Sequence, residues 1–387
     1  MGKIGQTDFG GVSEGNDFMK VALVHDDLVQ WGGAERVLEG LCEIFPDAPI
    51  FTSVYDYSNK ELAKRFGDKK IITSFLQKIV GWKTLYKALL PLYPIAFEQF
   101  DLTGYDLVIS HTTRFAKSII TKPQTKHICY CHTPPRFLWH IPKKENFGAG
   151  EVLFSKMRIF DRISSARVDH FIAGSKNAQK RIQKIYKMDS TVIYPFIDLG
   201  RFEGIETFDG GYFVVVSRLN KYKKADLAVE ACKILEVPLK IIGTGPELDR
   251  LKRIQPHFAK ASWGKGVWGG IELLGHLNDD AVVKVLAGCK GLIVPGIEDF
   301  GLVALEAQAL GKPVIAYSEG GSLETVVEGK SGIFFHDQSV DSLVQAIKRL
   351  GKIKIEPLGC IKNASEFSKE NFISNFKLTV ASLGYTI

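Results

Sequence analysis

Short apolar runs alternate with helical patterns along almost the whole chain, and no other feature restricts its possible folds as strongly. A run of three to five apolar residues bounded by loop residues is typical of a strand that is buried on both faces of a parallel sheet. Strands that alternate with helices are typical of doubly wound α/β domains. Strands are expected at residues 20–24, 107–109, 127–130, 170–173, 192–194, 212–216, 239–242, 291–294 and 313–316.

These strands fall into two series, with helices expected between them at residues 34–45, 178–186, 225–234 and 302–310. A chain of 387 residues also suits two domains of roughly 150–200 residues better than one core. We therefore expect Rossmann-like domains at residues 19–196 and 197–360, with a hinge at residues 194–198. Residues 1–18, with five glycines, are expected to form a flexible tail, and residues 361–387 a separate C-terminal segment.

Composition excludes several classes of protein. Hydrophobic residues make up 45% of the chain and charged residues 24%, which is typical of globular proteins. No apolar run approaches the roughly 18–20 residues of a membrane span, and no signal peptide is visible. Six irregularly spaced cysteines favour a reducing cytoplasm over a disulfide scaffold. The net charge of +7 suits anionic ligands or a membrane surface and is too diffuse to indicate nucleic-acid binding.

The segment at residues 295–306 follows an expected strand and opens an expected helix. The amides of Phe300, Gly301 and Leu302 should then be free helix-start donors, which accept phosphate or other anionic oxygens. Glu298 and Glu306 would accept hydrogen bonds from two hydroxyl-bearing parts of one ligand. The alternative makes Glu298 a partner of the helix dipole and Glu306 a solvated surface residue.

A basic loop follows the expected strand at residues 212–216. Four cations lie within seven residues there, at the strand end where α/β sheets bind ligands. Arg218 could hold a phosphate through two hydrogen bonds, and Lys223 could add a point charge, with Lys224 as the alternative lysine. A solvated basic loop would explain the same pattern.

Glycine-rich turns supply a third group of candidate sites. Gly32 and Gly33 lie between the first strand and the first helix, and the pair Gly320-Gly321 precedes Ser322, a candidate helix cap. The first turn lacks the dinucleotide pattern G-x-G-x-x-G, and that pattern at residues 264–269 has no strand before it. Both facts argue against a nicotinamide enzyme.

A metal centre has little support in the sequence. His127, Cys129 and Cys131 share one face of an expected strand, but no second cluster supplies further ligands. The chain has no Asp-x-Asp pattern to hold Mg²⁺ on a diphosphate. We therefore expect no metal site and no cofactor. Cations for a diphosphate and carboxylates for hydroxyls, on two facing domains, indicate a nucleotide-sugar site in an interdomain cleft.

The same residues resemble a known family. Glu298 to Glu306 matches the E-x7-E motif of the retaining glycosyltransferases of family 4, which have the GT-B fold, and the similarity extends from Met19 to about Leu383. Within the family, the chain is similar to mannosyltransferases that build bacterial O-antigen and other surface polysaccharides. The most specific similarities lie at residues 32–35, 90–98, 105–110, 132–134, 217–219 and 298–301.

The resemblance implies a role for each matching position. Residues 19–196 would form the acceptor-side domain, residues 197–360 the nucleotide-sugar domain, and residues 361–387 a helix that crosses back to the first domain, anchored by Phe367, Phe372 and Phe376. The implied donor site consists of Arg218 and Lys223 on the diphosphate, Gly32 and Gly33 near its distal phosphate, Glu298 and the amides of Phe300, Gly301 and Leu302 on the sugar, Glu306 on the ribose, and His132 beside the reacting centre.

The implied reaction is metal-independent, retaining transfer of a hexose, expected to be mannose from GDP-mannose. The expected acceptor is a saccharide linked to a lipid such as polyprenyl diphosphate, at the inner face of the cytoplasmic membrane. Residues 74–100 mix lysines with large apolar residues, as a peripheral amphipathic helix would, or as a core-facing helix with a basic outer face would. The alternatives are a UDP-sugar donor, a soluble acceptor, or an inactive carbohydrate-binding relative.

The chain departs from the family pattern at two places. Family members often have a Ser-Ser-Ser-His run where this chain has Ser110, His111, Thr112 and Thr113, and a tyrosine where it has Phe137. Residues 110–113 are expected to face the acceptor cleft, so this departure leaves the identity of the acceptor open. The phosphate and E-x7-E positions are intact.

Overall fold

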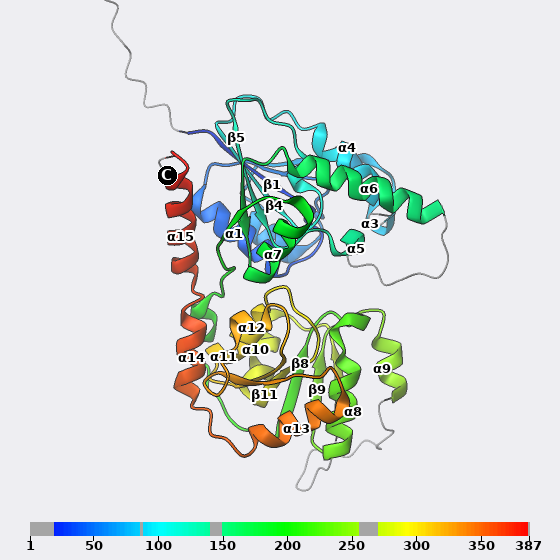
Figure 1. The fold of residues 1–387 in the computed structure, drawn as a ribbon, viewed down its shortest axis with the longest axis vertical. Coiled ribbons are helices and arrows are strands. Elements are labelled where there is room, and N and C mark those ends of the chain that lie inside the picture. Colours follow the sequence, from blue (N-terminus) through cyan, green and yellow to red (C-terminus); the bar gives the residue numbers. More distant parts are fainter. Residues whose placement is uncertain (1–18, 86–87, 140–148, 255–269, 386–387) are drawn as a thin grey trace, which may run out of the picture.

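The computed structural model describes residues 19–85, 88–139, 149–254 and 270–385, which form two α/β domains, one above the other in Figure 1. The first contains strands β1 (Val21–His25), β2 (Ile50–Thr52), β3 (Ile71–Thr73), β4 (Leu107–Thr112), β5 (Lys126–Cys131), β6 (His170–Ala173) and β7 (Ser190–Val192). Its helices are α1 (Gly33–Ile44), α2 (Lys60–Phe66), α3 (Trp82–Leu85), α4 (Tyr93–Glu98), α5 (Arg136–Trp139), α6 (Ala149–Ser165) and α7 (Lys176–Tyr186).

The second domain contains strands β8 (Tyr212–Val216), β9 (Leu239–Ile242), β10 (Ile271–Gly275), β11 (Cys289–Val294), β12 (Val314–Tyr317) and β13 (Gly332–Phe335). Its helices are α8 (Ala225–Leu235), α9 (Leu248–Ile254), α10 (Asp279–Ala287), α11 (Leu302–Ala309), α12 (Ser322–Thr325), α13 (Val340–Leu350) and α14 (Pro357–Ser365); the last helix of the chain is α15 (Lys369–Ser382). Short 3₁₀ turns join several of these elements.

Each domain is built on one parallel sheet. The strand orders are β3-β2-β1-β4-β5-β6-β7 and β10-β9-β8-β11-β12-β13, and all paired neighbours run parallel. Every residue of β1 and β4 is buried, because helices cover both faces of the sheet. The prediction of two doubly wound domains is confirmed.

Two details differ from the predicted elements. The strands β2, β3, β10 and β13 were not predicted, and β7 begins at Ser190, two residues earlier than expected. Within the segment at residues 74–100, the described residues 74–85 and 88–100 do not form one amphipathic helix. They form the 3₁₀ turns Phe75–Lys78 and Leu90–Leu92 and the short helices α3 and α4, because Gly81 takes a φ of 76° and prolines start the later turns.

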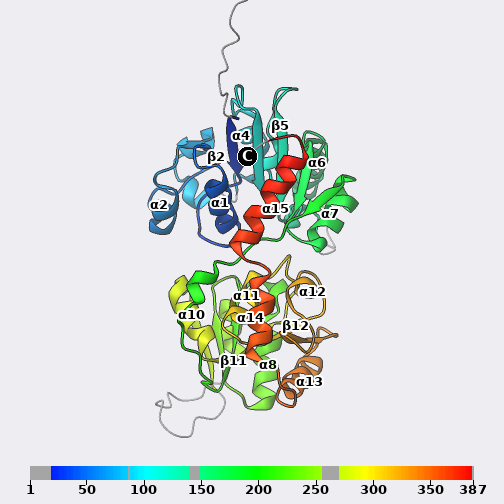
Figure 2. The ribbon, with the colours of Figure 1, turned by 90° about the vertical axis from the view of Figure 1, so that its left-hand side faces the viewer.

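The C-terminal helices lie end to end along one side of both domains, as Figure 2 shows. At the crossover the amide of Ile197 donates to the carbonyl of Phe367 at 2.9 Å. Beyond it, Phe372 and Phe376 of α15 are buried in the core of the first domain. Phe367, expected as a third anchor there, is instead part of the core of the second domain, where its ring contacts Phe300. The crossing segment expected at residues 361–387 begins inside α14, and α14 contacts α11 through a 2.5 Å hydrogen bond between Asn363 and Gln308. Only α15 packs on the first domain.

Two further findings concern the environment of the chain. All six cysteines are free and buried. Among the helices that the structure describes, none is long and apolar enough to cross a membrane.

Candidate functional site

A cavity of about 770 Å³ lies between the two domains. Its walls come from loops that follow β1 and β4 in the first domain and β8, β9 and β10 in the second. The carboxyl ends of both parallel sheets therefore face the same space, which is where open α/β sheets bind ligands. The 264–269 glycine pattern lies outside the described residues.

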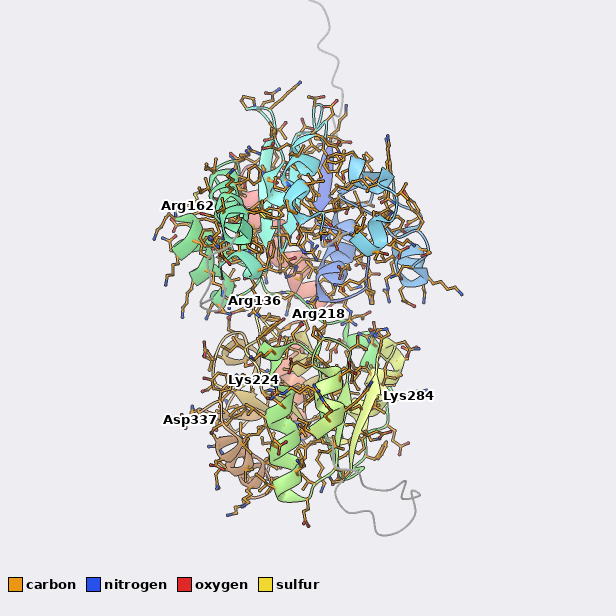
Figure 3. The ribbon with its side chains drawn as sticks, turned by 90° about the vertical axis from the view of Figure 1, so that its right-hand side faces the viewer. Arg136, Arg162, Arg218, Lys224, Lys284 and Asp337 are labelled. Atoms are coloured by element: carbon orange, nitrogen blue, oxygen red, sulfur yellow. The ribbon has the colours of Figure 1, made fainter. Side chains whose placement is uncertain are left out.

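Arg218 and Arg114 place two positive charges in this cavity. Arg218 follows β8, and Figure 3 shows it at the edge of the second domain that faces the first. Arg114 comes from the loop after β4 and pairs with Asp27. Burial lowers the pKa of Arg114, and the charge of Arg218 lowers it further. Arg218 has no carboxylate partner in the described part of the chain, so its charge is available to an anionic ligand, whereas the charge of Arg114 is paired with Asp27.

The loop that carries Arg114 is held by a buried carboxylate. Asp26 accepts hydrogen bonds from the backbone amides of Thr113 at 2.6 Å, Phe115 at 2.9 Å and Ala116 at 2.8 Å. Burial opposes its negative charge, but Arg114 and these amides hold the pKa of Asp26 below its usual value. The arginine therefore projects from a rigid turn.

Lys223 and Glu298 are brought together in the second domain. Nζ of Lys223 lies 2.5 Å from Oε2 of Glu298, and both side chains are largely buried. A Cβ at Gly296 would lie 2.6 Å from the Cα of Lys223, so only glycine allows the two loops to approach this closely. The neighbouring Lys224, the alternative phosphate lysine, adopts a left-handed conformation at the start of α8.

The starts of α1 and α11 meet across the domain boundary. Gly301 precedes α11 with a φ of 101°, which favours glycine. The ring of Phe300 is buried and stacks on Tyr194 with centroids 5.4 Å apart. A Cβ at Gly33 would lie 2.9 Å from Cδ1 of Leu302. The predicted glycine turn and the predicted helix start thus belong to one site.

Glu306 is buried rather than solvated, which excludes the alternative of a surface helix residue. Its Oε1 lies 2.5 Å from Arg36 of α1 and 3.5 Å from Arg201. Both arginines also contact Asp279 at the start of α10, at 2.8 Å and 3.6 Å. Trp31 donates to the same Asp279 carboxylate at 3.1 Å. Glu306 therefore belongs to a charge cluster that joins the two domains.

A second interdomain contact involves Asp299, next to Glu298. Its carboxylate pairs with Arg181 of α7 and with Arg136 of α5, the latter at 2.7 Å. Figure 3 shows Arg136 at the edge of the first domain, toward the second. Glu324 accepts hydrogen bonds from the amides of Lys176 and Asn177 at the start of α7, at 2.7 Å and 2.9 Å. Gly321 precedes α12 in place of Ser322, the predicted cap.

His132 follows β5 and is partly exposed. Its Nε2 lies 2.6 Å from Nε2 of His111, and burial lowers its pKa to about 4. His132 is therefore neutral at physiological pH and can both donate and accept a hydrogen bond. In the part of the chain that the structure describes, no three His, Cys, Asp or Glu side chains are grouped to hold a metal ion.

Two family models together match residues 31–367. Residues 31–201 match Glycosyltransferase Family 4, and residues 201–367 match Glycosyl transferases group 1. The chain belongs to glycosyltransferase family 4. It is therefore a transferase of the GT-B type.

Curated relatives of this family 4 glycosyltransferase include mannosyltransferases. The chain is 24% identical to the alpha-1,3/1,6-mannosyltransferase of Dictyostelium discoideum over 371 residues, 81% of this chain and 85% of the relative. It is 33% identical to a GDP-mannose-dependent alpha-(1-6)-phosphatidylinositol monomannoside mannosyltransferase of Mycolicibacterium smegmatis over 297 residues. That match covers 74% of this chain and 62% of the relative. An uncharacterized glycosyltransferase of Methanocaldococcus jannaschii is 29% identical, with 56% of this chain and 59% of the relative covered.

Solved structures share the fold at low sequence identity. Sucrose-phosphate synthase from Thermosynechococcus elongatus superposes with a TM-score of 0.70 and 15% identity, covering 95% of this chain and 99% of the other. Anabaena HepE in complex with UDP and glucose superposes with a TM-score of 0.68 and 18% identity, covering 94% and 100%. These likenesses support the GT-B architecture.

Sequence reasoning missed several residues at the cleft of this family 4 glycosyltransferase. Arg36 and Arg114 lie within four residues of a segment that the sequence singled out, and Asp299 lies inside one without having been assigned a role. Arg201 and Asp279 lie in no motif, and their role became visible only when the domains were placed face to face.

Buried neutral histidines should make the stability of the protein depend on pH. Burial lowers the pKa of His127 to about 4 and that of His111 well below 6.5. Below about pH 6.5 the unfolded chain therefore binds protons that the folded chain does not, so stability is lost as pH falls from there toward 4. We expect a loss of about 1 kcal/mol per pH unit for each such histidine.

Urea unfolding between about pH 7.5 and 5, where Asp and Glu scarcely titrate, measures the slope of the free energy of unfolding against pH. Replacing His127 with glutamine, which retains a donor and an acceptor, should make the slope smaller. A free energy of unfolding that stays constant across this range would contradict the prediction.

Proposed function

We propose that the protein transfers mannose from GDP-mannose, with retention and without a metal ion, to a lipid-linked saccharide acceptor in the synthesis of a surface glycan. The observation that carries the proposal is the interdomain cavity, where Arg218 lies near Arg114 and has no carboxylate partner among the described residues. The choice of mannose and GDP is supported by the mannosyltransferases among the relatives.

Electrostatic stabilisation of the leaving diphosphate would supply most of the catalysis. Arg218, which is exposed at the cavity wall, and the largely buried Lys223 would provide the positive charge that stabilises the diphosphate. They would take the place of a divalent cation. The acceptor hydroxyl would attack from the face that the diphosphate leaves, and a diphosphate oxygen would take its proton.

Glu298 would exchange partners when the donor binds. It contacts Lys223 in the structure, and a diphosphate would draw this lysine to its own oxygens. The carboxylate would then be free to accept hydrogen bonds from sugar hydroxyls. Similarly, Glu306 would give up part of its contact with Arg36 and accept hydrogen bonds from the ribose hydroxyls. The contact of Glu306 with Arg36 joins the two domains, whereas that of Lys223 with Glu298 lies within the second domain. A nucleotide sugar would replace one partner in each.

A thermal-shift panel with GDP, UDP, ADP and their sugar conjugates tests the donor. Ligand at about 100 times Kd should add about 2.7 kcal/mol of stability, and we expect this effect from GDP and GDP-mannose in EDTA. Transfer of radiolabelled mannose from GDP-mannose to a polyprenyl-diphosphate-linked saccharide tests the reaction. A response to UDP conjugates alone would contradict the GDP-mannose donor, and a response to no nucleotide would indicate an inactive relative.

Peripheral contact with anionic lipid would bring the enzyme to such an acceptor. Val80 is 93% exposed and Ile95 57% exposed, and exposed Lys78 and Lys83 lie close by in the sequence. Figure 1 shows α3, α4 and α6 on the same side of the first domain. Exposed apolar side chains among lysines suit the headgroup boundary of an anionic bilayer.

We expect the protein to float with phosphatidylglycerol vesicles, and the Val80→Glu/Ile95→Glu variant to float several-fold less. Both changes place a negative charge where apolar contact with the bilayer is expected. Ile234→Glu, at a site 59% exposed on α8 of the second domain, is the matched control and should float like the unchanged protein. Equal flotation of all three proteins would rule out this surface.

A further inference from the structure

Three histidines form a hydrogen-bonded row across the carboxyl ends of β1, β4 and β5. Nδ1 of His25 lies 2.8 Å from Nδ1 of His111, and Nε2 of His111 lies 2.6 Å from Nε2 of His132. His25 and His111 are partners in the parallel register of β1 and β4, and their rings lie nearly coplanar, with centroids 5.0 Å apart and planes 20° apart. The sheet itself therefore sets the spacing of the row.

The row connects a buried carboxylate to a partly exposed imidazole. At one end, Oε1 of Glu35 in α1 lies 3.7 Å from Nε2 of His25, and both residues are buried. At the other end, Nδ1 of His132 has no hydrogen-bond partner among the residues that the structure describes. Next to it is Gly174, which has no side chain to cover the nitrogen; a Cβ there would lie 3.6 Å from it.

The carboxylate decides the direction of the hydrogen bonds. A neutral imidazole has one N–H donor and one bare acceptor nitrogen. A bare Nε2 of His25 would direct its lone pair toward the negative charge of Glu35, so the proton of His25 belongs on Nε2. Nδ1 of His25 then accepts from Nδ1 of His111, and Nε2 of His111 accepts from Nε2 of His132.

We propose that Glu35, acting through His25 and His111, holds His132 as the tautomer with its proton on Nε2, so that its Nδ1 accepts a hydrogen bond from a hydroxyl of the transferred sugar. Glu35, His25 and His111 are positioning residues in this arrangement. A bare nitrogen attracts hydroxyls and repels phosphate oxygens, so the row would select the sugar end of the donor. The assignment of the ligand rests on the proposed function, whereas the tautomer does not.

Other charges face the row as well. Asp26 follows His25 in the chain, and Asp299 of the second domain acts on His132. A second proton on His25 would reverse every hydrogen bond and place the proton of His132 on Nδ1. The experiment is therefore carried out at about pH 8, where a histidine with an ordinary pKa is neutral.

Nitrogen-15 NMR of the full chain with labelled histidine distinguishes the two tautomers. The signal of His132 is assigned by its loss in His132→Asn. We expect the proton on Nε2 in the unchanged protein, and a substantial fraction on Nδ1 in Glu35→Gln, because the glutamine amide can donate to His25. A proton on Nδ1 of His132 in the unchanged protein, or a tautomer unaffected by Glu35→Gln, would overturn the proposal.

Two controls isolate the row. His127 lies on β5, the strand that precedes His132, but its ring contacts Ser110 at 2.8 Å and the carbonyl of Arg167 at 3.2 Å. Its tautomer should therefore stay constant in all variants. Glu39→Gln makes the same substitution one turn later in α1, where the carboxylate pairs with Arg65, and should leave His132 unchanged. If Glu35→Gln is too unstable for spectra, His111→Phe breaks the row. This variant should likewise allow a substantial fraction of His132 to carry its proton on Nδ1.

Binding measurements test the ligand separately. Losing one hydrogen bond to the sugar should lower kcat/KM for GDP-mannose about tenfold in Glu35→Gln, with the Kd of GDP unchanged. If Glu35→Gln weakened the binding of GDP by the same factor as it lowered kcat/KM for GDP-mannose, the role at the sugar would be contradicted. If GDP-mannose does not bind to the unchanged protein, the proposed function fails, while the NMR result still decides the tautomer.

Discussion

Replacing Arg218 with alanine should lower kcat/KM for the nucleotide sugar by about 100- to 1,000-fold. This corresponds to about 3–4 kcal/mol of transition-state stabilisation, the usual effect of removing one group that faces developing negative charge. Arg218 lines the interdomain cavity and has no carboxylate partner in the described chain, so its charge is available to the leaving diphosphate. Its removal leaves no buried acid unpaired, and the Tm should change little. Initial rates over a range of donor concentrations and a melting curve measure both effects.

Arg250→Ala is the matched control for this prediction. Arg250 belongs to the same domain, but it is exposed and pairs with Asp226 and Glu247 on the surface. Exposed ion pairs contribute little, so activity and Tm should stay close to those of the unchanged protein. An Arg218→Ala variant with full kcat/KM would rule out its role at the diphosphate.

Replacing Asp161 with alanine should lower the free energy of unfolding by about 3–5 kcal/mol, the cost of leaving a buried charge without its partner. Asp161 of α6 pairs with Lys117, and both side chains are fully buried. The same carboxylate accepts from Trp139 of α5 at 2.7 Å and from Tyr186 of α7 at 3.0 Å. It therefore joins three helices to the loop after β4. For a domain of this size the Tm should fall by roughly 6–20 °C.

A double variant separates the buried charge from the loss of packing. Lys117→Met/Asp161→Leu removes both charges and keeps similar volumes, so it should recover much of the lost stability. Asp249→Asn, at an exposed pair with Lys252, should change the Tm by no more than a degree or two. If the Tm of Asp161→Ala equals that of the unchanged protein, the Lys117–Asp161 pair contributes no net stability.

The central strands were predictable and several outer ones were not. The apolar runs of β1, β4 and β8 are long enough to stand out because these strands are covered on both faces. The strands β2 and β3 have three residues each, and such short runs also occur in loops and helices. The amphipathic pattern at residues 74–100 was misleading for a related reason: spacing alone does not show that a glycine and two prolines divide it.

Some residues of the candidate site were likewise predictable from the sequence and others were not. Arg218, Lys223, Glu298 and the glycine turn at residues 32–33 lie next to strand ends, and local pattern was enough to single them out. The roles assigned to them at the donor remain predictions. Pattern gave no indication that Glu306 is shared between Arg36 and Arg201, because these partners are about 270 and 105 residues away.

The sequence by itself therefore determined the two-domain α/β architecture, the family and the segments that carry the site, because each depends on local periodicity or on a short motif. Only the tertiary structure decided which charges face one another: Arg218 with Arg114, Lys223 with Glu298, and Glu35 with the histidine row. The physical reason is that these contacts arise where parallel strands end side by side and two domains meet. Residues far apart in the chain become neighbours there, and no local pattern records their distance.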